Sequence, residues 1–184
     1  MNTNPSTQKN DLGYKKQNTD ILIVGAGPAG LSLALHLIQI SKEWASRILI
    51  IEKKKHPRRK LCGGALSVPA LEILENLSLD PPEDIFAVDE IRIRFQKHSY
   101  SLKGNPVLKI VNRASFDHFL SETLKSKGVR ILEEVSFESA NAQNDGYLVE
   151  TNIGTIYCRS LVGADGSSSI VRKSLGLKRN NKVS

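Results

Sequence analysis

The chain has 184 residues, of which 40% are hydrophobic and 24% are charged, which suits one domain with a sizeable core or slightly more than one. This composition is that of an ordinary soluble globular protein, without internal repeats or low-complexity tracts. The net charge of +7 leaves nucleic acid, an anionic membrane surface and an acidic small molecule open as partners.

The two cysteines, Cys62 and Cys158, are too few for a disulfide framework, so we expect a reducing, cytoplasmic compartment. The four histidines have no metal-ligand spacing, and no metal site is predicted. Residues 1–19 are polar and lack the apolar core of a signal peptide, so we expect a disordered tail. Residues 179–184 form a second, basic polar tail.

Residues 20–52 predict a strand, a glycine turn, a helix and a second strand. Residues 21–24 are an unbroken apolar run, which is typical of a parallel strand buried on both faces. Residues 47–51 restore a strand that ends in Glu52. Between the two strands, apolar residues recur at helical spacing, namely Leu31, Ala34, Leu35 and Ile38.

The glycine turn has the spacing G-x-G-x-x-G, with Gly25, Gly27 and Gly30. In a strand-turn-helix unit the first glycine allows a tight turn, the second lets a diphosphate approach the backbone, and the third lets the helix pack closely on the strand. The N–H groups of the new helix then face the phosphates. Glu52, at the end of the second strand, can accept hydrogen bonds from ribose hydroxyls, which favours FAD or NAD over NADP. The alternative is a purely structural strand-helix-strand unit.

A basic run follows the second strand and contains Lys53, Lys54, Lys55, Arg58, Arg59 and Lys60. Such a run is commonly a solvated loop, and nucleic acid or an anionic membrane surface is an alternative partner. Its position beside the predicted phosphate site favours a third interpretation, a cationic rim for a dinucleotide or an acidic substrate.

Cys62, Gly63 and Gly64 come next, and paired glycines let a backbone pass close to a flat ligand. Residues 68–77 predict a short helix with Ser67 as its cap, ended by Pro81 and Pro82.

Three strands are then predicted, at residues 90–95, 100–102 and 106–111. The first alternates apolar residues with arginines, which indicates an antiparallel sheet with one wet face. We interpret residues 85–112 as the start of a substrate-side sheet.

The remaining chain predicts a helix from Asn112 to a stop at Gly128, and then a strand at residues 129–132. A three-stranded meander follows at residues 135–140, 147–151 and 155–158. A buried strand at residues 160–162 leads into Asp165 and Gly166, before a last short helix at residues 171–175. These further predicted elements are consistent with an α/β fold.

Four motifs in one order resemble those of FAD-dependent oxidoreductases with the para-hydroxybenzoate hydroxylase type of fold. They are GAGPAG at residues 25–30, KLCGGALS at 60–67, Arg113-x-x-Phe116-Asp117-x-x-Leu120, and VGADGSSSIVR at 162–172. The K-x-C-G-G element is most similar to the geranylgeranyl reductase branch, which reduces prenyl double bonds. The resemblance covers nearly everything from Asp20 to Leu177.

The resemblance implies an α/β, Rossmann-like FAD/NAD(P)-binding fold with a parallel sheet, an antiparallel three-stranded meander and a partial substrate-side sheet. The FAD-binding domain would span residues 20–178, interrupted by the partial sheet at 85–112. Such a domain would bind FAD and use NAD(P)H as the electron donor.

The resemblance also implies roles for individual residues. The diphosphate of FAD would be wrapped by Gly25, Gly27, Pro28, Ala29 and Gly30. The adenosine would be held by Glu52, Lys53 and the backbone of Val135. The ribityl or diphosphate part would contact Asp165 and Gly166, near a path for NAD(P)H. Arg113 would reach the FAD from its helix start, and the isoalloxazine would lie along the segment that contains Lys60, Cys62, Gly63 and Gly64.

Each of these roles has a structural alternative. Asp165 precedes a helix and could simply cap it, as could one of the serines at residues 167–169. Arg113 could be a surface residue in a first helical turn, where its charge is mildly unfavourable. Cys62, the one catalytic candidate, could be a small hydrophobe, and Cys158 lies in an alternating strand and is expected to be structural.

The resemblance favours a geranylgeranyl reductase-like enzyme that reduces prenyl or related apolar double bonds. The alternatives are an FAD-dependent aromatic-ring monooxygenase and a non-catalytic dinucleotide-binding remnant. Family members run to about twice the present length, well above one ordinary domain, and they carry a later Gly-Asp-Ala motif that is absent here. We therefore expect the N-terminal part of such an enzyme, truncated or completed by a separate chain. Its partner would be a small apolar molecule rather than nucleic acid, and peripheral contact with a membrane stays open.

Overall fold

The computed structural model describes residues 17–80 and 85–178. These residues divide into two compact units. The first unit contains the described residues up to Lys55 and from Ser121 onward, and the second unit spans His56–Leu120. The boundary falls within the helix α4 (Arg113–Ser126). The predicted breaks at Pro81 and Pro82, residues 1–16 and the tail at 179–184 lie outside the described residues.

The first unit is built on a six-stranded sheet with the order β6-β2-β1-β9-β8-β7. Its parallel part contains β1 (Gln17–Val24), β2 (Ile48–Glu52), β6 (Arg130–Glu133) and β9 (Gly154–Gly163). Its antiparallel part is the predicted meander, in which β7 (Phe137–Gln143) and β8 (Gly146–Thr151) lead into β9. The sheet confirms the predicted α/β fold class with a parallel sheet and an antiparallel meander.

Apolar residues bury both faces of the sheet at its central strands β1 and β2. On one face, Leu22 and Val24 join a buried cluster with Val171 of the short helix α5 (Ile170–Ser174). Ile23 points to the other face, because neighbouring side chains alternate along a strand. The helix α1 (Pro28–Ile40) lies on that face, since an atom added at Gly30 would come within 3.0 Å of the Ile23 side chain. A single turn, α2 (Trp44–Arg47), precedes β2.

Two predicted boundaries in the first unit are wrong. β1 begins at Gln17 rather than at Asp20, because Gln17 to Thr19 already pair with β9. The predicted strands at 155–158 and 160–162 are one strand, β9. It continues through Arg159 because its residues pair with β8 on one edge and with β1 along the other.

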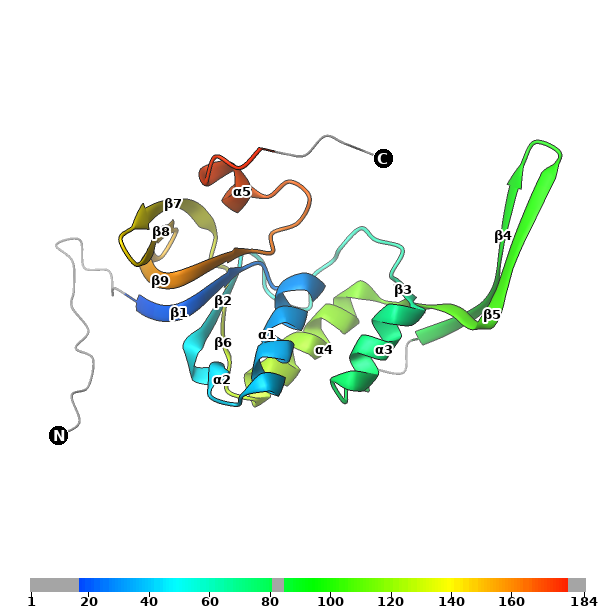
Figure 1. Ribbon diagram of the computed structural model, residues 1–184, viewed down its shortest axis with the longest axis horizontal. Coiled ribbons are helices and arrows are strands. Elements are labelled where there is room, and N and C mark those ends of the chain that lie inside the picture. The colour runs from blue at the N-terminus through cyan, green and yellow to red at the C-terminus, as the bar shows by residue number, and fades with distance from the viewer. Residues whose placement is uncertain (1–16, 81–84, 179–184) are drawn as a thin grey trace. The chain divides into compact units, whose positions relative to one another are not determined.

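The second unit is built on a three-stranded antiparallel sheet with the order β3-β5-β4 (Figure 1). β4 (Ile85–Phe95) and β5 (His98–Val111) form the long hairpin, and the short β3 (Ala65–Ser67) leads into the helix α3 (Val68–Asn76). Ser67 occupies the predicted N-cap position of α3, but its side chain makes no capping hydrogen bond.

The predicted strands at 100–102 and 106–111 are also one strand. Val88 of β4 pairs with Leu108, whereas Glu90 pairs with Lys103, so residues 104–107 form an irregular bulge opposite Asp89. Gly104 and Pro106 therefore mark the bulge and do not end the strand. The third strand of the sheet is β3, which lies outside the predicted range of 85–112.

Candidate functional site

The predicted nucleotide-binding residues of the first unit gather at one edge of the sheet. β6, β2, β1 and β9 are parallel neighbours, so their carboxyl ends share this edge. Backbone hydrogen bonds tie together the segments that leave it, at 2.8 Å from Gly25 N–H to Ile51 O and 3.0 Å from Val135 N–H to Glu52 O. Ala164 N–H donates to Val24 O at 2.8 Å in the same way. In open α/β sheets, ligands bind outside the carboxyl ends of the strands.

The glycine turn depends on two of its glycines for its shape. Gly25 has a φ of +109°, and a Cβ there would lie 2.4 Å from Ala164 O. A Cβ on Gly30 would lie 2.1 Å from Gly25 O. Contacts this short do not occur between real atoms, so neither position accepts a side chain without a shift of backbone. The first and third glycines therefore have the roles that the motif predicts, a tight turn and close packing of helix on strand.

No side chain from the cap or first turn of α1 compensates its N-terminus. Gly27 is its N-cap, no side chain makes a capping hydrogen bond, Pro28 begins the helix, and the first turn contains no acidic residue. The positive end of the helix dipole and the first backbone N–H groups therefore meet no anion from α1's own first turn or cap. Such a terminus is suited to a phosphate.

The N-terminus of α5 is capped in contrast. Ser169 Oγ accepts a hydrogen bond from Arg172 N–H at 3.0 Å, and Asp165 Oδ2 accepts from Ile170 N–H at 2.6 Å and from Val171 N–H at 3.2 Å. Burial raises the pKa of Asp165, but hydrogen bonds from Ser169, Val171 and Ile170 outweigh burial and hold the pKa below its ordinary value. The capping alternative for Asp165 is thus present in the structure. Gly166 beside it has open space where a side chain would be.

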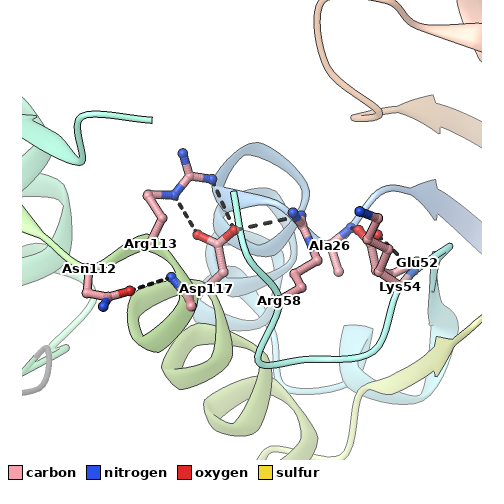
Figure 2. A network of polar contacts seen from close by, with 8 residues as sticks. Ala26, Glu52, Lys54, Arg58, Asn112, Arg113 and Asp117 are labelled. Atoms are coloured by element: carbon pink, nitrogen blue, oxygen red, sulfur yellow. Dashed lines mark hydrogen bonds and ion pairs between the residues drawn. The ribbon is translucent and has the colours of Figure 1, made fainter. Parts of the chain in front are cut away.

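Glu52 is buried, with 5% of its surface exposed, and it shapes the glycine turn (Figure 2). Its Oε2 accepts a hydrogen bond from Ala26 N–H at 3.0 Å, and its Oε1 accepts from Lys54 N–H at 3.1 Å. Each carboxylate oxygen can accept more than one hydrogen bond, so these bonds are compatible with the predicted ribose contact. Lys53, the other predicted ribose residue, is exposed.

The second unit contains a buried group of charges around Asp117 (Figure 2). Asp117 has no exposed surface and accepts two hydrogen bonds from Arg113, from Nε at 2.8 Å and from Nη2 at 3.0 Å. Arg58 Nη2 lies 3.7 Å from the same carboxylate. The side chains of Arg58 and Arg113 are only 12% and 16% exposed. Arg113 is therefore not the simple surface residue of the alternative prediction.

Cys62 lies near this group and is exposed. A hydrogen bond from Gly64 N–H, at 3.5 Å from Sγ, and the Arg113 side chain lower the pKa of Cys62. Gly64 has a φ of +72°, and a Cβ there would lie 2.0 Å from Val111 O, so this position requires glycine. Gly63 has open space around it, and Lys60 is exposed. Cys158, by contrast, is buried, and burial raises its pKa to about 11.

Sequence reasoning did not assign a site role to Asp117, and it placed Arg58 only within the basic run predicted to form a cationic rim. The spacing of four between Arg113 and Asp117 is a detectable signal, because residues i and i+4 are neighbours on a helix. The contact between Arg58 and Asp117 could not be predicted locally, because the two residues are far apart in sequence and the fold brings them together. Within residues 17–80 and 85–178, no group of three or more His, Cys, Asp or Glu residues could hold a metal ion. No helix in the same ranges is long and apolar enough to cross a membrane.

Comparison with known proteins places these features in a family. Residues 18–183 match the family model described as FAD binding domain. An uncharacterized protein of Methanosarcina barkeri is 29% identical over 163 residues, which cover 86% of this chain and 40% of that protein. Digeranylgeranylglycerophospholipid reductase 2 of Methanosphaera stadtmanae is 29% identical over 177 residues, which cover 89% of this chain and 43% of the reductase.

A solved structure supports the same fold. The geranylgeranyl bacteriochlorophyll reductase-like protein of Thermoplasma acidophilum superimposes with a TM-score of 0.73 at 24% identity, over 89% of this chain and 43% of that one. The chain thus spans less than half the length of each of these three proteins.

Proposed function

The chain belongs to the FAD binding domain family, and on that premise we propose that it is the FAD-holding part of a geranylgeranyl reductase-like oxidoreductase. FAD would bind at the carboxyl edge of β2, β1 and β9. The observation that carries this proposal is the uncapped N-terminus of α1, which directly follows a glycine turn at that edge. A phosphate there would meet both the helix dipole and free backbone donors.

The residues at this edge fit the cofactor. The diphosphate would lie against Gly25, Gly27, Pro28, Ala29 and Gly30. Glu52 would accept hydrogen bonds from the adenosine ribose with Lys53 beside it, and the backbone of Val135 would face the adenine. Asp165 would cap α5 and also lie beside the ribityl or diphosphate part of FAD, since capping and ligand binding can coexist at one helix terminus. For Lys60, Cys62, Gly63, Gly64 and Arg113, a role toward the flavin is proposed from the family resemblance alone.

The flavin, when bound, would supply hydride transfer between NAD(P)H and the substrate. We propose a prenyl or related apolar alkene as the substrate, because the Methanosphaera stadtmanae relative is named as a prenyl lipid reductase. The partner is then a small molecule and not nucleic acid. Reduction of a lipid substrate would take place at the cytoplasmic surface of a membrane. A chain with a net charge of +7 is attracted to such a surface when its lipids are anionic.

The first test measures cofactor binding. We expect purified protein to take up added FAD, seen as a change in flavin fluorescence. Gly27→Val should weaken this binding by more than about tenfold, because a branched side chain would stand where the diphosphate approaches the backbone. Ala142→Val makes a similar increase in size at an exposed position of β7 and should bind FAD normally. Protein that takes up no FAD, or equal affinity in both variants, would refute the placement.

The second test separates the reactions. Flavin absorbance that NADPH bleaches without oxygen, and that a geranylgeranyl lipid restores, supports the reductase. Restoration only by oxygen with hydroxylation of an aromatic ring would assign a monooxygenase. FAD binding with no bleaching by NADH or NADPH would leave a non-catalytic binding module. Each outcome starts from FAD-loaded protein, so failure here is distinct from failure of the binding site.

A further inference from the structure

Cys62 is held beside the start of α4 by the backbone of the second unit. The ladder between β3 and β5 continues beyond β3 through a hydrogen bond of 2.9 Å from Val111 N–H to Gly64 O. Gly64 N–H in turn donates to Cys62 Sγ at 3.5 Å. Arg113 begins α4 directly after β5, and its side chain forms a hydrogen bond with the Cys62 thiol. The sheet therefore brings the thiol and the guanidinium together.

The Arg113 side chain is fixed from its other side by Asp117. Asp117 Oδ1 accepts a hydrogen bond from Arg113 Nε at 2.8 Å, and Asp117 Oδ2 accepts from Arg113 Nη2 at 3.0 Å. Two parallel hydrogen bonds of this kind fix the plane of a guanidinium as well as its position. Asp117 has no exposed surface, so bulk water does not compete for its oxygens. A guanidinium has five N–H donors, so the contact with Asp117 leaves donors for the thiol.

Arg113 and Asp117 act on the Cys62 thiol in opposite directions. The hydrogen bond from Gly64 N–H lowers the pKa of Cys62 most, and the hydrogen bond and the positive charge of Arg113 lower it further. The negative charge of Asp117 raises the same pKa, but by less than either effect of Arg113. Asp117 can therefore favour the ionised thiol only through Arg113, and not by its own charge.

We propose that Asp117 is a positioning residue, which holds the Arg113 guanidinium against the Cys62 sulfur and so stabilises the thiolate form of this cysteine. Stability alone does not account for Asp117, because apolar residues of similar size often replace a buried ion pair without loss.

The thiolate is the nucleophilic form of cysteine. A group that ionises nearer to neutral pH also exchanges a proton more readily with a bound molecule. What this proton exchange does for the reaction rests on the proposed function. The positioning of Arg113 is a property of the chain without FAD.

The test is the pH profile of Cys62 alkylation by iodoacetamide, followed by mass spectrometry of the Cys62 peptide in protein without FAD. Asp117→Asn should move the midpoint of the profile to higher pH and lower the rate at pH 7 by about threefold, because Arg113 is released. Loss of the negative charge alone would instead move the midpoint to lower pH. Asp89→Asn makes the same chemical change at an exposed position of β4 and should leave the profile unchanged.

A double-mutant cycle shows whether the effect passes through Arg113. Arg113→Ala alone should move the midpoint to higher pH, and Asp117→Asn added to it should cause no further rise. Three results overturn the proposal: a lower midpoint in the single variant Asp117→Asn, an unchanged midpoint in that variant, or an equal rise in the Arg113→Ala background.

Arg113→Lys gives a second test that does not depend on the folding of Asp117→Asn. Lysine retains the positive charge but cannot bind a carboxylate with the two-point geometry of a guanidinium. The midpoint should therefore again move to higher pH, whereas an unchanged midpoint would mean that charge alone is sufficient and would also overturn the proposal. None of these measurements uses FAD, so they are independent of the outcome for the proposed cofactor site.

Discussion

The strands of the first unit bury their apolar side chains, whereas the hairpin of the second unit exposes them. Leu22 and Ile50, in β1 and β2, have no exposed surface, whereas Ile93 and Tyr100 in the hairpin are 61% and 65% exposed. The second unit nevertheless buries Asp117 completely, between two arginines. The first unit thus buries the apolar residues of its central strands, whereas the hairpin of the second unit leaves its apolar residues exposed.

The two units therefore differ in the kind of side chain that they bury. Burial of apolar area stabilises the first unit, and its polar contacts serve to shape the strand edge at which the cofactor site is proposed. The second unit buries the charge group around Asp117 and leaves apolar residues of its hairpin exposed. Four experiments test this contrast, and they follow in order of decreasing expected effect.

Each unit contains one of the two cysteines, Cys158 in the first and Cys62 in the second, so their reactivities compare the two units. Cys62 is exposed with a lowered pKa, whereas Cys158 is buried with a pKa of about 11. Iodoacetamide at pH 7.5 should modify Cys62 about a thousandfold faster, because a buried thiol reacts only through openings that cost about 4 kcal/mol. Mass spectrometry of the peptides over time measures both rates, and Cys62→Ser isolates the slow one. Comparable modification rates for Cys62 and Cys158 would mean that the reagent reaches the core of the first unit freely.

Asp117→Asn removes the charge that two arginines share. The change should lower the free energy of unfolding by about 3 kcal/mol, because it leaves buried cations without their counter-ion. Urea unfolding measures the loss, and hydrogen exchange should locate it in the second unit. Glu90→Gln removes one carboxylate from the exposed pair with Arg92 and should leave the urea midpoint unchanged. Equal midpoints for the two variants would refute the assigned role of Asp117.

Glu52→Gln tests the polar contacts at the strand edge of the first unit. We expect a loss of about 2 kcal/mol in the free energy of unfolding, since the buried carboxylate accepts two backbone N–H groups. FAD affinity should fall as well, through the ribose contact of the proposed function. Glu138→Gln, at an exposed position of β7, is the control. Lost stability with unchanged FAD affinity would restrict Glu52 to shaping the turn.

Asp165→Asn weakens the cap of α5 and should cost about 1 kcal/mol. Since folding lowers the pKa of Asp165, its contribution is present above the ordinary value of 3.8 and is lost as the pH falls through the lower folded value. The difference between wild type and variant should therefore be constant near pH 6 and shrink below pH 4. Thermal unfolding across this range measures it, with the exposed Asp89→Asn as control. A stability difference between wild type and variant that grows as the pH falls would contradict the assigned lowering of the Asp165 pKa.

Local patterns predicted several elements of the first unit, because the signal for each of these elements lies within a short stretch of sequence. The apolar run of β1, the glycine spacing and the helical repeat of α1 are each readable within a few residues. The same reasoning split β9 at Arg159 and β5 at Gly104, because strand continuity there depends on partners far away in the chain. Tertiary pairing overrides local breaks of this kind.

In the candidate site, the positions of residues could be predicted from the sequence, but their contacts could not. Residues that leave the carboxyl ends of parallel strands can be found from motif and order, as Gly25, Glu52 and Asp165 were. Their hydrogen-bond partners could not be found, because Ala26 N–H reaches Glu52 only after two strands have paired. Arg58 near Asp117 is a contact of the same kind.

The parallel pairing of β1 with β9 also bears on biosynthesis. Ile21 pairs with Ser160, so β1 leaves the ribosome well before the strand that fills its second edge. At translation rates of ~5–20 residues per second, this interval is on the order of ten seconds. During that time the nascent sheet exposes an apolar edge strand, and we expect chaperones that bind extended apolar segments to engage it there.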